Sequence, residues 1–271
     1  MPTGPVLVTG GGGFLGRRVV RLAAAAGIDV VAPGSTELDV RDAGAVEQCV
    51  RSIRPSAVVH LAYRVHERDT IVDGSANIAR GAANVGSRLV HLSTDVVFAG
   101  RTTPYTEADP LTPVYAYGVA KADAERVVAQ VDPGAVLVRT SLLYATDPND
   151  PGAPVEAVRG ALADPATSVF FTDEVRCPAS VDDVAAAVVA LCGDRELIGV
   201  SGPLHLAGAD AVSRFDFAQA IAQWLGADGG ALRPGTQANL GLVRPGHLIL
   251  DSSRAASLGL HCRGVDALLG R

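Results

Sequence analysis

Short apolar runs alternate with stretches in which apolar residues recur every three or four positions in the first half of the chain. The runs predict buried strands, and the amphipathic stretches predict helices. A strand over Pro5–Thr9, a helix over 17–26 and a second strand over 28–32 form a βαβ unit, which is typical of a doubly wound parallel sheet. Further strands are expected at 57–62, 88–92 and 135–139, with helices ending near 53, spanning about 71–85 and carrying residues 117–121.

The pattern changes after residue 145, where Asp147–Pro154 gathers residues that interrupt helices and strands. Helices follow near 155–163, 181–191 and 215–225, and Ser180 and Ser213 are expected to cap two of them, each with an acid three residues on. The predicted fold is α/β, a Rossmann-type doubly wound parallel sheet with a smaller C-terminal α/β part. We expect residues 1–145 to form the first domain and residues 146–271 mostly the smaller part, with some segments returning to the Rossmann core.

Composition narrows the class of protein. Of 271 residues, 48% are hydrophobic and 19% charged, which excludes disorder, and the apolar runs are too short for a membrane span. No signal peptide is recognisable, so we expect a cytoplasmic protein without a membrane partner. The net charge of −6 argues against nucleic acid. The widely spaced cysteines predict buried reduced thiols rather than a metal site or disulfides; they are Cys49, Cys177, Cys192 and Cys262.

Glycines at three-residue spacing follow the first strand directly. Gly10, Gly13 and Gly16 form a GxxGxxG turn that also contains Phe14 and Leu15 and opens the first helix. Missing side chains let backbone N–H groups and the helix N-terminus approach a pyrophosphate. The position of the turn therefore predicts a dinucleotide-binding site. We accordingly expect residues 1–145 to bind NAD(P) and residues 146–271 to form mostly the substrate-binding part.

The second strand ends in Ala32-Pro-Gly-Ser-Thr36, without the carboxylate that usually contacts the adenosine ribose of NAD. Ser35, Thr36 and Arg17 or Arg18 are candidates to contact a 2′-phosphate instead. This favours NADP(H), with NAD as the alternative. The other interpretation is that residues 32–36 form a plain turn and that Arg17 and Arg18 are solvated.

Tyr117 and Lys121 are four residues apart on a predicted helix and share one face. A cation beside a phenol stabilises the phenolate, which makes tyrosine a usable acid near neutral pH. Lys121 is the only lysine in a chain with 23 basic residues, which suggests a site that needs a compact ammonium. An ordinary solvated helix pair is the alternative.

Ser93, Thr94 and Asp95 follow the fourth strand, where side chains of a doubly wound sheet face the ligand crevice. Local turn capping is the alternative for Ser93 and Asp95. The loop 96–114 is a candidate substrate wall. His60, in an apolar strand, is interpreted as a hydrogen-bonded core histidine.

TGGGGFLG, STDVVF and YAYGVAK occur in one order along the chain. This combination resembles the extended short-chain dehydrogenase/reductase family. Within this family, three segments are most similar in sequence to the dTDP-4-dehydrorhamnose reductase branch. They are LDVRDAGAVEQCVRSIRPSAVVHLA, STDVVFAGRTTPYTEADPLTPVYAYGVAKADAE and VRTSLLY. The resemblance covers most of residues 3–145.

The resemblance implies that Thr94 hydrogen-bonds the substrate carbonyl, Tyr117 is the general acid, and Lys121 supports Tyr117 and holds the nicotinamide ribose. Asp95 and Arg176 are candidates for substrate contacts, Arg176 for the nucleotide diphosphate, with turn capping and a surface salt bridge as the respective alternatives. Further residues are placed along the cofactor by the same resemblance: Asp39, Val40, Leu61, Ala62 and Tyr63.

The expected activity is NAD(P)H-dependent reduction of a keto group on a nucleotide-linked, dTDP-type deoxysugar, without a metal. An epimerase of the same fold that retains NAD is one alternative, and a cofactor-binding regulatory subunit without catalysis is another. The resemblance also implies a homodimer formed through a pair of helices.

Overall fold

The computed structural model describes residues 4–242 and 244–270, which divide into two compact units. Unit 1 comprises residues 1–94, 116–139 and 185–204, and unit 2 comprises residues 95–115, 140–184 and 205–271. The chain therefore crosses between the units several times. In the described residues, no helix combines the length and the apolar character that a membrane crossing requires.

Unit 1 is built on a six-stranded sheet with the strand order β11-β6-β4-β3-β1-β2. β1 pairs in parallel with β2 and β3, and β3 pairs in parallel with β4. This order confirms the doubly wound α/β prediction. The strands are β1 (Val6–Thr9), β2 (Val30–Val31), β3 (Ala57–His60), β4 (Arg88–Thr94), β6 (Val136–Thr140) and β11 (Gly202–His205).

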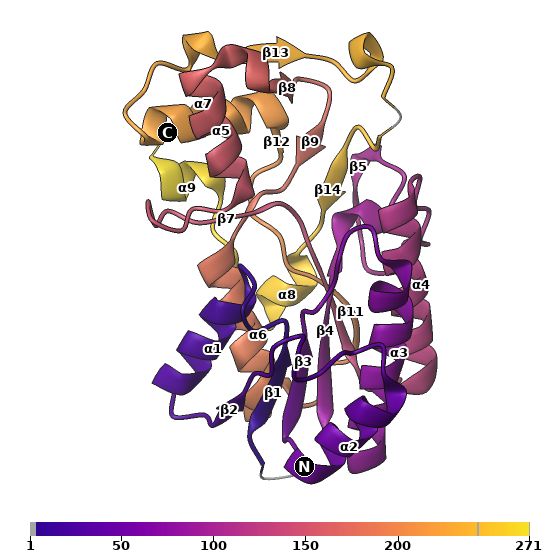
Figure 1. The fold of residues 1–271 in the computed structure, drawn as a ribbon. Helices are drawn as coiled ribbons and strands as arrows, with labels where there is room; N and C mark the ends of the chain where they lie inside the picture. The colour runs from indigo at the N-terminus through magenta and orange to yellow at the C-terminus, as the bar shows by residue number, and fades with distance from the viewer. Residues whose placement is uncertain (1–3, 243, 271) are drawn as a thin grey trace. The chain divides into compact units, whose positions relative to one another are not determined.

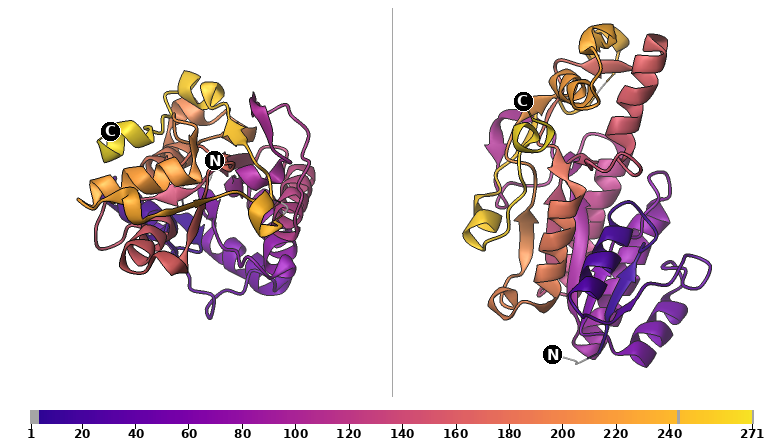
Figure 2. Two further views of the ribbon diagram at one scale, coloured as in Figure 1. Left: turned by 90° about the horizontal axis from the view of Figure 1, so that it is seen from above. Right: turned by 90° about the vertical axis from the view of Figure 1, so that its left-hand side faces the viewer.

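Helices cover both faces of this sheet (Figures 1 and 2). α1 and α6 lie on one face, and α2, α3 and α4 lie side by side on the other. Leu7, Val58 and Leu89 from the strands pack against Val46 and Ile78 from the helices in one buried cluster. The helices are α1 (Gly16–Ala25), α2 (Ala43–Ile53), α3 (Arg68–Val85), α4 (Ala116–Val131) and α6 (Val181–Gly193).

Two element boundaries in unit 1 differ from the sequence prediction. β2 has only two residues instead of the expected five, and β4 continues to Thr94 instead of ending at Leu92. β4 lies between β3 and β6, so its backbone has pairing partners on both sides. Thr94 is therefore the last residue of a central strand rather than the start of a loop.

Unit 2 consists of short strand pairs around a cluster of helices. Tyr144, Val158, Phe170, Phe217 and Ile221 are buried in its core, and the rings of Tyr144 and Phe217 meet edge to face. The helices are α5 (Ala153–Ala163), α7 (Arg214–Trp224), α8 (Ser253–Ser257) and α9 (Val265–Leu269). The strands are β5 (Arg101–Tyr105), β7 (Leu143–Tyr144), β8 (Val169–Phe171), β9 (Val175–Arg176), β10 (Ala179–Ser180), β12 (Val212–Ser213), β13 (Arg233–Gly235) and β14 (Leu248–Leu250).

The segment 95–115, expected within the N-terminal domain, belongs to unit 2. It contains β5, which pairs in parallel with β14. This partner lies more than a hundred residues further along the chain, so local sequence carries no sign of the pairing. The segment 185–204 belongs to unit 1.

Local capping explains several helix starts. Ser213 Oγ accepts a hydrogen bond from Asp216 N at 3.0 Å, and Ser180 Oγ accepts one from Asp183 N at 3.4 Å, which confirms both predicted caps. In unit 1, Asp42 caps α2 by accepting from Ala45 N at 3.0 Å.

Candidate active site

The glycine turn between β1 and α1 depends on the absence of side chains. Gly10 has φ +73°, and a Cβ there would lie 2.8 Å from the Leu61 and Ala62 backbone. A Cβ on Gly16 would lie 2.1 Å from the Gly10 carbonyl oxygen. The turn closes when Gly13 N donates to Gly10 O at 3.0 Å. Glycine is therefore required at 10 and 16 for the first helix to start this close to the strand.

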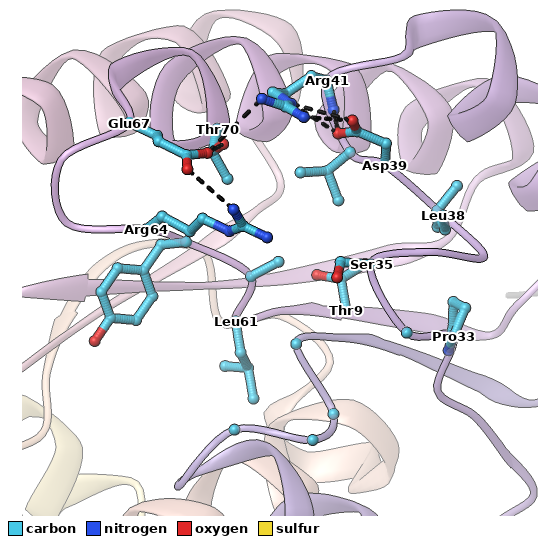
Figure 3. A pocket seen from close by; sticks show the side chains of 18 of the residues that line it. Thr9, Pro33, Ser35, Leu38, Asp39, Arg41, Leu61, Arg64, Glu67 and Thr70 are labelled. Atoms are coloured by element: carbon cyan, nitrogen blue, oxygen red, sulfur yellow. Dashed lines mark hydrogen bonds and ion pairs between the residues drawn. The ribbon is translucent and has the colours of Figure 1, made fainter.

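A cavity of about 740 Å³ in unit 1 opens over this turn. Its walls come from the segments that follow β1, β2 and β3, at the carboxyl edge of the sheet where such folds bind ligands. Figure 3 shows side chains that line the cavity and labels ten of them. Of the residues predicted to bind cofactor, the cavity is lined by Gly10, Gly13, Phe14, Ser35, Asp39, Val40, Leu61, Ala62 and Tyr63.

Three other predicted cofactor residues lie beside the turn but are not among those that line the cavity. Leu15 and Gly16 are buried at the start of α1, and Arg17 is exposed with its guanidinium 5.7 Å from the Phe14 ring centre. Arg18, expected to be solvated if it made no phosphate contact, is instead 3% exposed and donates to the Phe14 carbonyl at 3.0 Å.

A network of charges lines the cavity at the ends of β2 and β3 (Figure 3). Arg41 binds both carboxylate oxygens of Asp39, with Nη2 2.7 Å from Oδ2. Arg64 donates to Glu67 at 3.0 Å, and Thr70 Oγ1 donates to the other Glu67 oxygen at 2.8 Å. Hydrogen bonds from Arg41 lower the pKa of Asp39 to about 2.

Sequence reasoning missed Arg41, Arg64, Glu67 and Thr70. Arg64 lies two residues after the predicted strand 57–62, and this position was the available signal for it. Asn77 on α3 also contributes, because its Nδ2 donates to the Val40 and Arg41 carbonyls at 3.0 and 3.1 Å. This amide fixes the segment that carries Arg41.

A carboxylate does stand near the end of β2, although none occurs in residues 32–36. Glu37 turns back, and its Oε2 accepts a hydrogen bond from the backbone N–H of Gly34 at 2.7 Å. Gly34 and the two hydroxyl residues beside it, Ser35 and Thr36, line the cavity. Both hydroxyls therefore stand in the position from which contact with a 2′-phosphate was predicted.

The predicted catalytic residues come from two adjoining elements of unit 1. Thr94 ends β4, while Tyr117 and Lys121 stand one turn apart on α4. Lys121 is 5% exposed, and its Nζ donates to the Leu92 carbonyl at 2.6 Å. Lys121 thus ties α4 to β4 two residues before Thr94.

Tyr63 connects the cavity to the α4 residues. Tyr63 lines the cavity, and its ring centre is 6.0 Å from the ring centre of Tyr117. Lys121 Nζ is 5.8 Å from the ring centre of Tyr63. Tyr117 and Lys121 therefore lie beside the cavity rather than on a remote helix surface.

Burial lowers the pKa of Lys121 to about 8, and the Glu125 carboxylate opposes this change. His60 and His91 lie on the neighbouring strands with pKa values lowered by burial and then by Lys121. His60 contacts Thr9 Oγ1 at 2.7 Å and Ser75 Oγ at 3.1 Å, which confirms it as a satisfied core histidine.

The two candidate substrate residues meet each other within unit 2. Asp95 is 3% exposed and accepts from Ser141 Oγ at 2.7 Å. Arg176 is 4% exposed, 3.1 Å from Glu174 and 3.8 Å from Asp95. The alternative of a surface salt bridge for Arg176 is therefore wrong, because the ion pairs are buried.

Cys177, Cys192 and Cys262 are buried free thiols, as expected, and Cys49 is partly buried. Within residues 4–242 and 244–270, no cluster of three or more histidine, cysteine or acidic side chains could hold a metal ion.

The sequence matches the family described as RmlD substrate binding domain over residues 4–264. The chain belongs to this family. The match covers nearly the whole chain and places it in the RmlD branch of the extended short-chain dehydrogenases/reductases, which confirms the resemblance seen in the motifs.

Curated relatives of this RmlD family chain carry more than one name. It is 34% identical to dTDP-4-dehydrorhamnose reductase of Mycolicibacterium smegmatis over 272 residues, which are 94% of this chain and 80% of the relative. It is 30% identical to methionine adenosyltransferase 2 subunit beta of Pongo abelii over 288 residues, which are 96% of this chain and 84% of the relative.

The solved dTDP-4-dehydrorhamnose reductase of Bacillus anthracis, in complex with NADP, superposes with a TM-score of 0.87 at 24% identity. The comparison covers 98% of this chain and 97% of that one. It confirms the Rossmann-type fold of this RmlD family member.

Proposed function

We propose that this chain is an NAD(P)H-dependent reductase of a keto group on a nucleotide-linked deoxysugar of the dTDP type. The observation that carries the proposal is the placement of Tyr117 and Lys121 beside Tyr63, a residue of the cavity wall. The 34% identity to a dTDP-4-dehydrorhamnose reductase supports the substrate class.

The cavity residues fit a dinucleotide. Gly12 lines the cavity, and a Cβ there would meet no protein atom within 4 Å, so the backbone of the turn is open to a ligand at this point. Backbone N–H groups near the N-terminus of α1 suit a pyrophosphate. When bound there, the cofactor supplies the hydride. The protein supplies position, charge and a proton.

In the proposed mechanism, Thr94 and Tyr117 donate hydrogen bonds to the substrate carbonyl oxygen. Negative charge grows on this oxygen as the ketone is reduced, so donors placed there stabilise the transition state. Tyr117 transfers its phenolic proton to the oxygen, and the Lys121 ammonium stabilises the phenolate that results.

NADP(H) is the proposed cofactor, and NAD is an alternative that the cavity accommodates. Ser35 and Thr36 offer hydroxyls near the end of β2, and Arg41 and Arg64 bring positive charge to the same cavity. Arginine forks and hydroxyls are suited to a phosphate group. The solved relative from Bacillus anthracis contains NADP.

On the substrate side, Asp95 and Arg176 stay candidates for substrate contacts in unit 2, the proposed substrate-binding part. Their ion pair is buried, so substrate contact requires one of them to exchange its present partner. A homodimer is likewise a prediction, which sedimentation of the purified protein tests.

The experiment is a stopped assay of NADPH oxidation with a dTDP-4-keto-6-deoxyhexose, with product identification by NMR. We expect NADPH consumption and a new sugar alcohol in equal amounts. Tyr117→Phe provides the inactive control. Absence of turnover across several nucleotide-linked keto sugars, in protein shown to bind NADPH, contradicts the proposal.

The 30% identity to methionine adenosyltransferase 2 subunit beta favours a second candidate, a subunit that binds a cofactor without chemistry. Under that candidate Tyr117→Phe leaves every function unchanged, because no proton is transferred. Cofactor binding without turnover, together with tight association with a methionine adenosyltransferase, would support it.

A further inference from the structure

A buried carboxylate lies one helical turn beyond Lys121 on α4. Glu125 is 2% exposed and binds Arg139 of β6 through two nitrogens, with Nη2 2.8 Å from Oε2 and Nε 3.1 Å from each oxygen. Arg139 is itself 3% exposed. Removing two charges from water costs free energy that their mutual attraction often fails to recover. A contribution to folding stability is therefore weak evidence for why the buried Glu125–Arg139 pair is present.

Glu125 also holds the strand that carries Thr94. Ser93 Oγ donates a hydrogen bond to Glu125 Oε1, and Lys121 Nζ donates to the Leu92 carbonyl at 2.6 Å. Two successive residues of β4 are thus bound by two residues one turn apart on α4. These contacts set the register between the strand end at Thr94 and the helix that carries Tyr117.

Titratable and aromatic groups from several elements surround Lys121. On its own helix it has Glu125, whose partner Arg139 comes from β6, and the Tyr63 ring lies 5.8 Å from its ammonium. His60 on β3 and His91 on β4 are buried, and burial and the Lys121 charge both lower their pKa values. The neutral histidines offer no negative charge, so Glu125 is the group here that favours the protonated amine.

We propose that Glu125 is a positioning residue for the Tyr117–Lys121 pair: it locks α4 to β4 and β6 and provides the counter-charge that keeps Lys121 an ammonium. This inference rests on the proposed reductase function for its kinetic consequence. The electrostatic part concerns the protein without substrate and can be tested separately.

The chain offers a direct measurement, because Lys121 is its single lysine. Protein grown with ¹³Cε-lysine gives one side-chain NMR signal, whose shift follows the protonation of this amine. We expect Glu125→Gln to lower the pKa of Lys121 by about one pH unit relative to wild type. Glu125→Asp keeps the charge and should remain close to wild type.

Glu47→Gln is the matched control, since it makes the same change at an exposed α2 carboxylate paired with Arg51. It should leave the Lys121 titration unchanged. If Glu125→Gln folds poorly, Glu125→Met with Arg139→Met removes both buried charges together, which proteins tolerate better than removal of one. This double variant should also lower the pKa of Lys121.

The kinetic arm measures kcat and KM with the keto sugar. With the pKa of Lys121 near 8 in wild type and about one unit lower in Glu125→Gln, the lost charge should reduce kcat about twofold at pH 7 and about tenfold above about pH 9, with KM nearly unchanged. Glu125→Asp should recover part of the loss. A Lys121 titration that coincides with wild type in both charge-removing variants, or an unchanged kcat and pH profile in Glu125→Gln, overturns the inference. If wild type itself reduces no keto sugar, the proposed function fails, while the NMR titration still decides the counter-charge.

Discussion

The rings of Tyr63 and Tyr117 lie with their centres 6.0 Å apart. One ring belongs to the wall of the cavity above the glycine turn, and the other belongs to the helix that carries Lys121. This contact links the predicted cofactor site to the predicted proton donor within unit 1.

Tyr117→Phe keeps the ring and removes only the hydroxyl. We therefore expect an NADPH dissociation constant within about twofold of wild type and a loss of kcat of roughly 10²- to 10⁴-fold. Fluorescence titration and steady-state assays measure the two quantities. Turnover within tenfold of wild type would refute the role of Tyr117 as proton donor.

Lys121→Arg keeps a positive charge but replaces a compact ammonium with a planar fork. Lys121 Nζ donates to the Leu92 carbonyl at 2.6 Å in a buried site. The larger group cannot occupy the same space, so kcat should fall at least roughly 100-fold. Arg126→Lys, an exposed change on the same helix, should retain activity.

The lowered pKa of Lys121 predicts how stability depends on pH. The unfolded chain keeps the lysine proton up to about pH 10.5, whereas the folded protein releases it near pH 8. Between these values the unfolded state binds more protons, so this group makes the folded state more stable as pH rises. At neutral pH the buried charge costs up to roughly 3 kcal/mol.

Lys121→Met removes this titration. Urea unfolding should show the variant gaining most relative to wild type near about pH 7, with the difference shrinking toward about pH 10. A difference that does not change with pH would show that Lys121 titrates alike in both states. Activity of wild type should decline as pH rises through about 8, since the ammonium is lost.

Arg41 and Arg64 are expected to favour NADP over NAD. Each brings a guanidinium to the cavity wall, and a hydrogen bond between charged groups is worth a few kcal/mol at most. Arg41→Met and Arg64→Met should each weaken NADPH binding roughly tenfold and NADH binding much less. Arg51→Met, at an exposed position of α2 outside the cavity lining, is the control. Equal losses for both cofactors would argue against 2′-phosphate recognition by these arginines.

Gly16→Ala should disrupt the glycine turn. The added Cβ would lie 2.1 Å from the Gly10 carbonyl oxygen, a backbone atom that cannot move aside locally. We expect a loss of roughly 1–3 kcal/mol or more in unfolding free energy and weaker NADPH binding. At Gly12 a Cβ meets no atom within 4 Å, so Gly12→Ala should leave the stability of the cofactor-free protein unchanged. A Gly16→Ala protein as stable as wild type would contradict the packing argument.

Local patterns in the sequence were sufficient for the framework of unit 1. Apolar runs and helical periodicity predicted its sheet, the glycine spacing predicted the turn, and the four-residue spacing of Tyr117 and Lys121 predicted a shared helix face. These features depend on neighbours in sequence, because side-chain direction follows the period of the element.

Only the tertiary structure decided which distant groups meet. Periodicity cannot show three of these contacts. They are the meeting of Arg41, Arg64 and Glu67 at the cavity, the pairing of β5 with β14, and the Glu125–Arg139 ion pair. Such contacts arise when strands align in one sheet and bring their ends to one edge. The four-residue spacing therefore predicted that Tyr117 and Lys121 share a helix face, whereas tertiary packing determined which charged groups surround Lys121.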